Sequence, residues 1–270
     1  MHPSRLFLAA LFLPCAISGL TLSPALTQRS PAEPLPQTKR DRPSTSISLK
    51  PQTVVLSFGK KGAAFPDYRE ARIQYPIASG LTNATVLQKV QTAISLKQVV
   101  GQSLAEMKQE YKENQWLTEV AYAVNYNRNN LLDLTYAISG VGAYPSSFEK
   151  HVAVNLKTGQ RVRAKDLFKA EGLGAIAQTV DRMMQREIQQ KIAEVKQQEP
   201  DLGIDRFANH RFQPKNLEDF TLGTTGVTFH YNFEFPHVIK AIEPSGSYLL
   251  PYTQLIRYIR QDGVLAFHLK

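Results

Sequence analysis

The residues with the most chemical potential in this sequence lie in one stretch near the C-terminus, between positions 230 and 248. His230 and Glu234 are four residues apart and would share one face of a strand, because successive strand side chains alternate sides. His237 follows a proline whose bend could turn its ring towards them. Two imidazoles and a carboxylate can hold zinc with an open position for water. This pattern defines one hypothesis, a metal-dependent hydrolase.

Other chemistry in the same stretch needs only carboxylates and aromatic rings. Glu234 and Glu243 could form an acid and base pair acting on a glycan, and Tyr231 and Tyr248 could stack on sugar rings. The sequence contains no HExxH metal motif, GxSxG turn or phosphate-binding glycine loop. We therefore assign no catalytic residue, expect no metal and no cofactor, and favour a protein that is not an enzyme. The binding surface that we expect comprises His230, Tyr231, Glu234, His237, Glu243 and Tyr248.

Strands and a long helix must position this stretch. Residues 217–222 and 227–234 have strand patterns and are joined by a turn at residues 224–226, with the apolar side chains of the second run on one face. Residues 249–252 return and lead into a short helix that begins near Pro251. Before them, an apolar stripe of helical period runs from Ile176 to Val195 and predicts a helix that begins near Leu173, stops at Glu199-Pro200 and packs on the sheet.

The preceding region alternates strand and helix patterns. Asn83 caps a predicted helix, and a second helix is predicted over residues 104–114. Strands are predicted over residues 53–58, 71–77, 116–127, 131–138 and 148–156, the last three forming an antiparallel meander. The fold class is therefore α+β, with antiparallel sheets packed against a few helices. We expect two small subdomains, residues 51–168 with the meander and residues 169–270 with the long helix, a hairpin and a short helix.

The N-terminus indicates export. Arg5 precedes a short apolar run and small residues follow near Ala25, so residues 1–25 are predicted to be a signal peptide, with an uncleaved anchor as the alternative. Leu13-Pro14 before Cys15 do not fit a lipid-attachment motif, so we expect no lipoprotein. Residues 26–50 are rich in proline and polar residues and are predicted to be a disordered linker. The expected location is periplasmic or extracellular.

The charge of the chain limits its partners. Cleavage after Ala25 would remove Arg5 and no acid, which lowers the formal charge from +9 to +8. An exported basic protein favours anionic surfaces such as wall polymers or lipid headgroups, and the sequence has no aromatic-basic module typical of nucleic-acid binding. No apolar run after the signal is long enough for a transmembrane helix. We expect a cell-wall polymer or an envelope protein as the partner.

Several short motifs, taken in order, resemble a known family. They are Tyr136 with Gly142-Ala143-Tyr144, Asn155-Leu156-Lys157-Thr158-Gly159, Asp166-Leu167-Phe168, Phe220-Thr221-Leu222, Gly226-Val227-Thr228-Phe229 and Leu250-Pro251-Tyr252-Thr253-Gln254-Leu255. This order resembles a bacterial exported domain of unknown function, which forms the outer half of RsiV-type anti-sigma factors and the N-terminal part of PdaC-type peptidoglycan deacetylases. The resemblance covers about the last two thirds of the chain.

The resemblance implies an α+β fold of two units and first suggests a receptor for lysozyme. Charge argues against that role, because lysozymes are mostly basic and a basic partner would repel them at long range. Pro236-His237 and Pro244-Ser245-Gly246 also depart from the segment expected between the last strands. The sequence therefore favours a non-enzymatic exported envelope protein that binds a cell-wall glycan or an envelope protein. The alternative is the metal-dependent hydrolase with His230, Glu234 and His237.

Overall fold

The computed structural model of the protein describes residues 46–58, 69–198, 208–235, 240 and 242–269. Residues 42–270 group into one compact unit, and the boundary expected at residue 168 falls inside it. The expected signal peptide, residues 26–45 of the expected linker, and His237 lie outside the described residues. Within the described ranges, no helix combines the length and apolar character needed to cross a membrane. The fold is α+β, as the sequence predicts.

A five-stranded sheet with the order β1-β2-β3-β4-β5 forms the first half of this unit. Its strands are β1 (Ser48–Ser57), β2 (Glu70–Ser79), β3 (Leu117–Arg128), β4 (Leu131–Val141) and β5 (Pro145–Asn155). The predicted meander of the last three strands is confirmed, with antiparallel pairing throughout. Asn129 and Asn130 form its first turn at φ values of 55° and 61°, which asparagine tolerates better than most residues.

The β1–β2 hairpin joins this meander differently. β2 runs parallel to β3, with only Arg72↔Glu119 and Ile73↔Val120 in register. The strand β1 starts at Ser48, earlier than the predicted start at residue 53, so the end of the expected linker is strand and not disordered. Backbone pairing explains the difference, because β1 pairs with β2 from Ser48↔Ser79 to Ser57↔Glu70 and leaves most of its side chains exposed.

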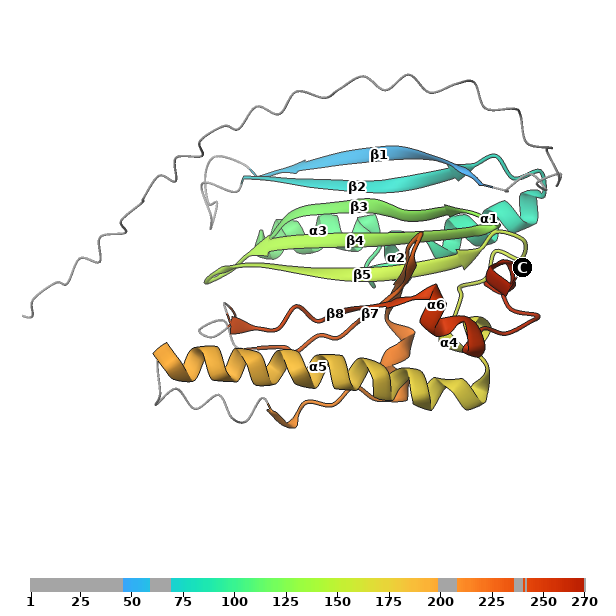
Figure 1. Ribbon diagram of the computed structural model, residues 1–270. Helices are drawn as coiled ribbons and strands as arrows, with labels where there is room; N and C mark the ends of the chain where they lie inside the picture. The colour runs from blue at the N-terminus through green and yellow to red at the C-terminus, as the bar shows by residue number, and fades with distance from the viewer. Residues whose placement is uncertain (1–45, 59–68, 199–207, 236–239, 241, 270) are drawn as a thin grey trace, which may run out of the picture. The chain divides into compact units, whose positions relative to one another are not determined.

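Three helices cover one face of the five-stranded sheet (Figure 1). They are α1 (Ala84–Ala93), α2 (Leu96–Val99) and α3 (Leu104–Asn114). The Asn83 side chain caps α1 as predicted, by accepting a hydrogen bond from the Val86 amide at 3.1 Å. Ser103 and Glu106 form a capping box, and this capping box fixes the residue at which α3 begins. The sequence pattern missed α2, which is a single turn.

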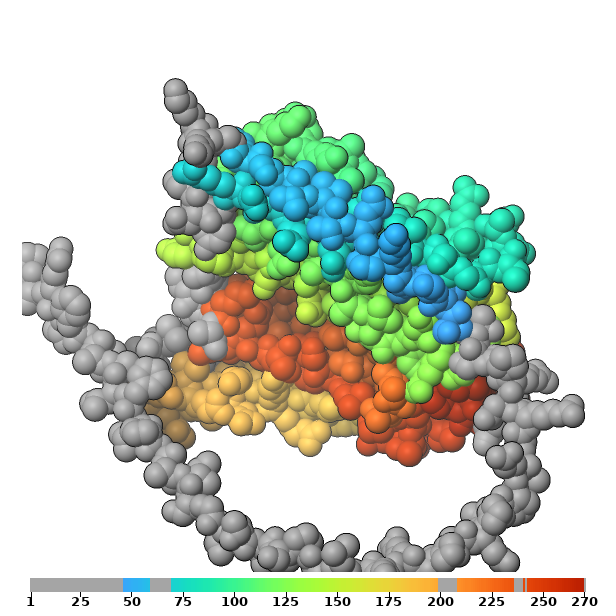
Figure 2. Space-filling model, turned by 90° about the horizontal axis from the view of Figure 1, so that it is seen from above, coloured from blue at the N-terminus to red at the C-terminus, as the bar shows by residue number. Residues whose placement is uncertain are grey.

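A three-stranded antiparallel sheet forms the second half of the unit. Its strands are β6 (Phe220–Leu222), β7 (Gly226–His230) and β8 (Ser247–Pro251), flanked by α4 (Ala164–Leu167), α5 (Ala170–Gln198), α6 (Tyr252–Leu255) and the short 3-10 helices Pro214–Glu218, Ile256–Tyr258 and Ala266–Leu269. In Figure 2, the orange and red C-terminal segments lie between the green strands and the gold helix α5. The predicted apolar stripe of α5 is buried, from Ile176 to Val195.

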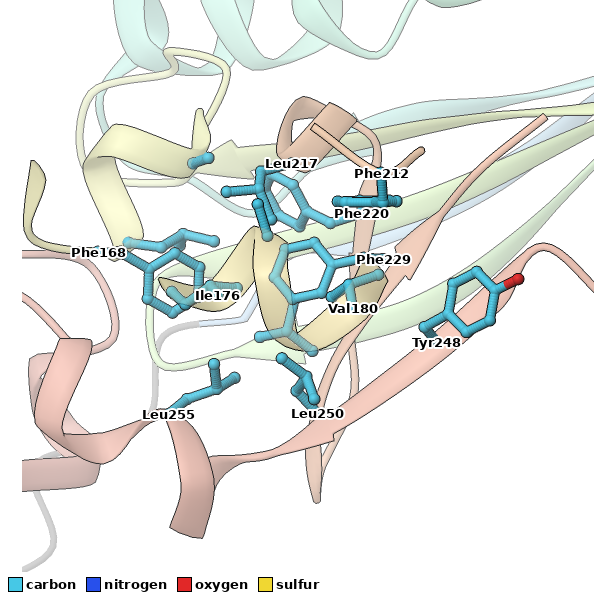
Figure 3. Packing of buried hydrophobic residues seen from close by; sticks show 14 of the residues in the cluster. Phe168, Ile176, Val180, Phe212, Leu217, Phe220, Phe229, Tyr248, Leu250 and Leu255 are labelled. Carbon is cyan, nitrogen blue, oxygen red and sulfur yellow. The ribbon is translucent and has the colours of Figure 1, made fainter. Parts of the chain in front are cut away.

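The apolar core of this half joins residues from every one of its elements. Figure 3 shows Phe229 of β7 and Leu250 of β8 near Ile176 and Val180 of α5. Gly226 is required at the tightest point, since a Cβ there would collide with the Leu250 carbonyl oxygen. The same core includes Tyr126, Leu131 and Ala153 from the larger sheet, so the smaller sheet packs on the face opposite the helices.

Candidate functional site

His151 lies where the two sheets meet. It is on β5 opposite Thr135, and Glu149 two residues earlier points to the same face of the strand. The His151 side chain is only 5% exposed, and its Nδ1 lies 2.7 Å from Oδ1 of Asp219. Its Nε2 lies 3.4 Å from Oε2 of Glu149. The imidazole is therefore held between two carboxylates, one on its own strand and one from the segment that begins β6.

His230 stacks flat on His151. The ring centroids are 3.9 Å apart with an interplanar angle of 16°. Nε2 of His230 lies 3.0 Å from the Thr221 hydroxyl, and Nδ1 lies 3.2 Å from the hydroxyl of Ser247, its cross-strand partner on β8. A hydroxyl can donate or accept, so these two partners satisfy either neutral tautomer of His230. The backbone also ties the pair together, because the His230 amide donates to the Asp219 carbonyl at 2.9 Å.

The two stacked rings have opposite pKa shifts. Burial alone would lower the pKa of His151, but the hydrogen bond and charge of Asp219, aided by Glu149, outweigh it and raise the pKa above 6.5. Burial and the adjacent charge of His151 lower the pKa of His230 to about 4. Burial tends to raise the pKa of Asp219, but its contact with His151 lowers it overall. Of the two rings, His151 therefore holds a proton more readily than His230, and Asp219 beside it is favoured in its ionised form.

A cleft of about 560 Å³ opens beside the stacked histidines. Its walls come from β5, the segment after β5, the 3-10 helix Pro214–Glu218 and the end of β7. Among the described residues that line it, four side chains are cationic: Lys150, Arg161, Arg163 and Lys215. Three carboxylates also line it: Glu218, Asp219 and Glu234. With His151 protonated, positive charge prevails in this cleft.

Two arginines of the cleft lie close together. Arg161 donates through Nη2 to the His151 carbonyl oxygen at 2.9 Å, and Arg163 Nη1 lies 3.6 Å from Oε2 of Glu218. The pKa of Arg161 is lowered by burial and then by the charge of Arg163. Neighbouring guanidinium groups repel one another, so an anion placed between them would relieve that repulsion.

Two of the predicted site residues besides His230 line this cleft. The Tyr231 hydroxyl lies 3.1 Å from Nδ1 of His210, and Glu234 is exposed at the cleft wall. The expectation that His230 and Glu234 share a strand face is wrong, because β7 ends at His230 and Glu234 has a left-handed φ of 54°. The Tyr231 amide still bonds to the Gly246 carbonyl, but the following aromatic side chains turn into the core.

The remaining predicted site residues lie elsewhere. Tyr248 is 4% exposed, and its hydroxyl donates to Glu187 of α5 at 2.9 Å. Glu243 accepts a hydrogen bond from the Phe235 amide at 3.2 Å and lies 3.6 Å from the Lys240 ammonium. These contacts hold the loop between β7 and β8, so the structure gives both residues a role in packing. His237 is outside the described residues, so its relation to the cleft stays a prediction.

The structure describes no group of three or more histidine, cysteine or acidic side chains with the geometry to hold a metal ion, within the ranges it covers. His230 would have to give up a hydroxyl partner to bind one. His230 belongs to the stacked pair with His151.

The sequence pattern missed His151 and Asp219, which complete the cluster around His230. Their separation along the chain is 68 residues, and only the packing of the two sheets brings them together. Strand alternation places Glu149 and His151 on one face of β5, and this was the one available signal. Two polar side chains on one face of a strand, next to a buried apolar run, indicate a position at which a polar partner should be sought on another element.

Comparisons with known proteins identify the fold. No protein-family model matches the sequence, and no curated protein is significantly similar to it. A DUF3298 family protein from Pseudomonas aeruginosa PAO1 is similar in structure, with a TM-score of 0.50 and 12% identity over 80% of this chain and 96% of that chain. A DUF3298 family member from Bacteroides fragilis NCTC 9343 gives a TM-score of 0.49 and 13% identity over 83% of this chain and 98% of that chain.

At these identities the likeness shows the fold alone, and it is a fold found in a domain of unknown function. Neither solved structure is described as an RsiV-type or PdaC-type protein, so the resemblance to those proteins stays a prediction. The chain therefore has the α+β architecture expected from its sequence.

Proposed function

We propose that this protein is a non-enzymatic exported protein of the bacterial envelope, and that it binds a cell-wall glycan in the cleft beside His151 and His230. The observation that carries this proposal is the composition of the cleft. Its lining combines four cationic side chains with the ring of Tyr231, and its volume of about 560 Å³ is within the range of small-ligand sites. Wall glycans present carboxylates and sugar rings, which such a lining can bind.

Export and the envelope partner rest on the sequence. The N-terminal pattern favours a signal peptide, and the basic charge of the chain favours an anionic polymer. A wall-binding role also fits the resemblance to exported domains of envelope proteins. An envelope protein as the partner is the alternative ligand, and the experiment below separates the two.

The cleft geometry supports binding better than catalysis. His151, the most buried of its histidines, has its ring nitrogens directed at Asp219 and Glu149. Both ring nitrogens of His230 are directed at hydroxyls. These contacts hold both rings within the fold, and we assign neither of them a catalytic role. The alternative is the hydrolase that uses His230, Glu234 and His237; His230 and Glu234 line the same cleft, and His237 is outside the described residues.

The test is retention of the full chain on purified peptidoglycan at low and moderate salt. Substitution of both Arg161 and Arg163 by glutamine should lower retention at least tenfold at both salt concentrations, because it removes two charges from the cleft wall. The matched control carries Arg182→Gln and Arg186→Gln, two exposed arginines on α5 that lose the same charge elsewhere. This control should bind like the wild type.

Three results would count against the proposal. Retention that disappears for the wild type at moderate salt would mean only nonspecific charge attraction. Equal loss in the two double variants would place binding outside the cleft. No retention on peptidoglycan, together with saturable binding of a purified envelope protein, would replace the glycan with a protein partner.

A further inference from the structure

The stacked histidines hold one proton between them. Two imidazolium rings 3.9 Å apart would repel strongly, so only one of them can be charged without cost. His151 faces two carboxylates, Asp219 and Glu149, whereas His230 faces two hydroxyls. The proton therefore resides on His151, and His230 stays neutral.

Charged groups from each neighbouring element surround this proton. Glu149 comes from β5, Asp219 precedes β6, His230 comes from β7, and Asp133 on β4 also acts on the charge of His151. Lys150 and Arg161 stand beside them, since Lys150 acts on Asp219 and Arg161 bonds the His151 carbonyl oxygen. Among the residues that the structure describes, His151 contacts both carboxylates.

We infer that the cleft takes an anionic ligand and that its binding is linked to the proton on His151. While His151 is protonated, its charge offsets the negative charge of the carboxylates beside it. Those carboxylates then subtract less from the attraction between the cations of the cleft wall and an anionic ligand. When the proton leaves, Asp219 and Glu149 lose the positive charge that contacts both of them, and Asp219 lines the cleft. An anion would then meet a weaker net attraction in the cleft, because one positive charge beside the carboxylates is gone.

This inference rests on the proposed function, because it names the chemistry and the control of the same cleft. Linkage makes the coupling reciprocal: a bound anion must raise the pKa of His151 by as much as the proton strengthens binding. Affinity should change about tenfold for each unit by which the ligand raises that pKa. A neutral ligand should show no such dependence.

The proton can be tested first without any ligand. NMR titration of the histidine ring signals in the full chain should give His151 a pKa above 6.5 and His230 a pKa well below it. Asp219→Asn keeps the shape of the side chain and removes its charge, so it should lower the pKa of His151. Asp262→Asn is the control, because Asp262 is exposed and pairs with Arg260 far from this cluster along the chain. A His151 that titrates at or below 6.5 would overturn the inference.

Binding is then measured by calorimetry at pH 5.5 and pH 8.5. The probes are N-acetylmuramyl dipeptide, an anionic wall fragment, and the neutral N-acetylglucosamine trimer. Affinity for the anionic probe should fall about tenfold or more at the higher pH, and the Asp219→Asn variant should shift the midpoint of this loss to lower pH. Anionic binding that is equal at both pH values would overturn the linkage and leave the proposed function standing. Tighter binding of the neutral probe would overturn the anionic class, and no binding of either probe at any pH would overturn the proposed function as well.

Discussion

The substitution Asp133→Asn should leave stability nearly unchanged near pH 4 and should stabilise the protein increasingly as the pH rises to about 7, with the gain kept at higher pH. Asp133 lies on β4 between the two sheets and is fully buried. Asn125 donates to its Oδ1 at 2.6 Å, the Leu222 amide also donates to the carboxyl group, and no described residue provides a partner for Oδ2. Burial therefore disfavours the charged form and raises the pKa of Asp133 to about 7.

The magnitude follows from proton linkage. Between the usual aspartate pKa of 3.8 and the folded-state pKa of about 7, the folded protein binds more protons than the unfolded chain. Stability therefore falls as pH rises through this window and stays low above it. About three pKa units at about 1.4 kcal/mol each give a penalty of about 4 kcal/mol at pH 8 as an upper value. Asparagine has the shape of the protonated acid and carries no such penalty.

The assay is urea unfolding followed by the fluorescence of Trp116, the single tryptophan, at pH 4, 6, 7 and 8.5. The variant and the wild type should unfold within about 1 kcal/mol of each other at pH 4, diverge as the pH rises to about 7, and keep that difference at pH 8.5. If the two stability curves run parallel from pH 4 to pH 8.5, the carboxylate of Asp133 is not protonated in the folded state and the reasoning is wrong.

Three further predictions concern stability. Gly226→Ala should lower the free energy of unfolding by about 2–4 kcal/mol in thermal unfolding, because the added Cβ collides with the Leu250 carbonyl. Gly174→Ala on α5 places its Cβ within 4 Å of no atom and should raise the free energy of unfolding by about 0.5–1 kcal/mol. Equal changes in the two variants would contradict the collision at Gly226. Ser103→Ala removes the capping box of α3 and should cost about 1 kcal/mol in urea unfolding, with the exposed Ser57→Ala as an unaffected comparison. Glu187→Gln should lower the free energy of unfolding by about 1–3 kcal/mol, since Glu187 accepts hydrogen bonds from the Ser245 amide and the Tyr248 hydroxyl. In a double-mutant cycle, the same substitution should cost less when Tyr248 is already replaced by phenylalanine.

Local patterns in the sequence were enough to predict most of the elements. Strand alternation and two asparagines in a turn indicated the meander, and the apolar stripe from Ile176 to Val195 indicated α5. Helix α2 was missed because one turn is too short to show a helical period. The predicted extension of β7 to Glu234 failed because the chain still alternates apolar and polar residues there while its backbone leaves the sheet at His230.

The candidate site could be predicted only in part, for a reason of topology. His230 and Tyr231 were identified because aromatic and ionisable residues cluster locally in the sequence. His151 pairs with Asp219 across the junction of two sheets, and no local pattern encodes that junction. Tyr248 shows the converse difficulty, since its hydroxyl resembles a binding group in sequence but is bonded to Glu187 inside the fold.

The attachment of the β1–β2 hairpin has a consequence for how the molecule opens. Its backbone ladder to β3 is short, so much of its attachment comes from side chains: Gln91 bonds to Pro76 and Ala78, Tyr111 to Arg69, and Asn127 to Ile47. Amides of β1 and β2 should therefore exchange with deuterium through a partial opening of lower free energy than the global unfolding that releases β3, β4 and β5. The amides of the β3–β5 meander should then exchange most slowly, and the β1–β2 hairpin should open as a separate cooperative unit at the edge of the sheet.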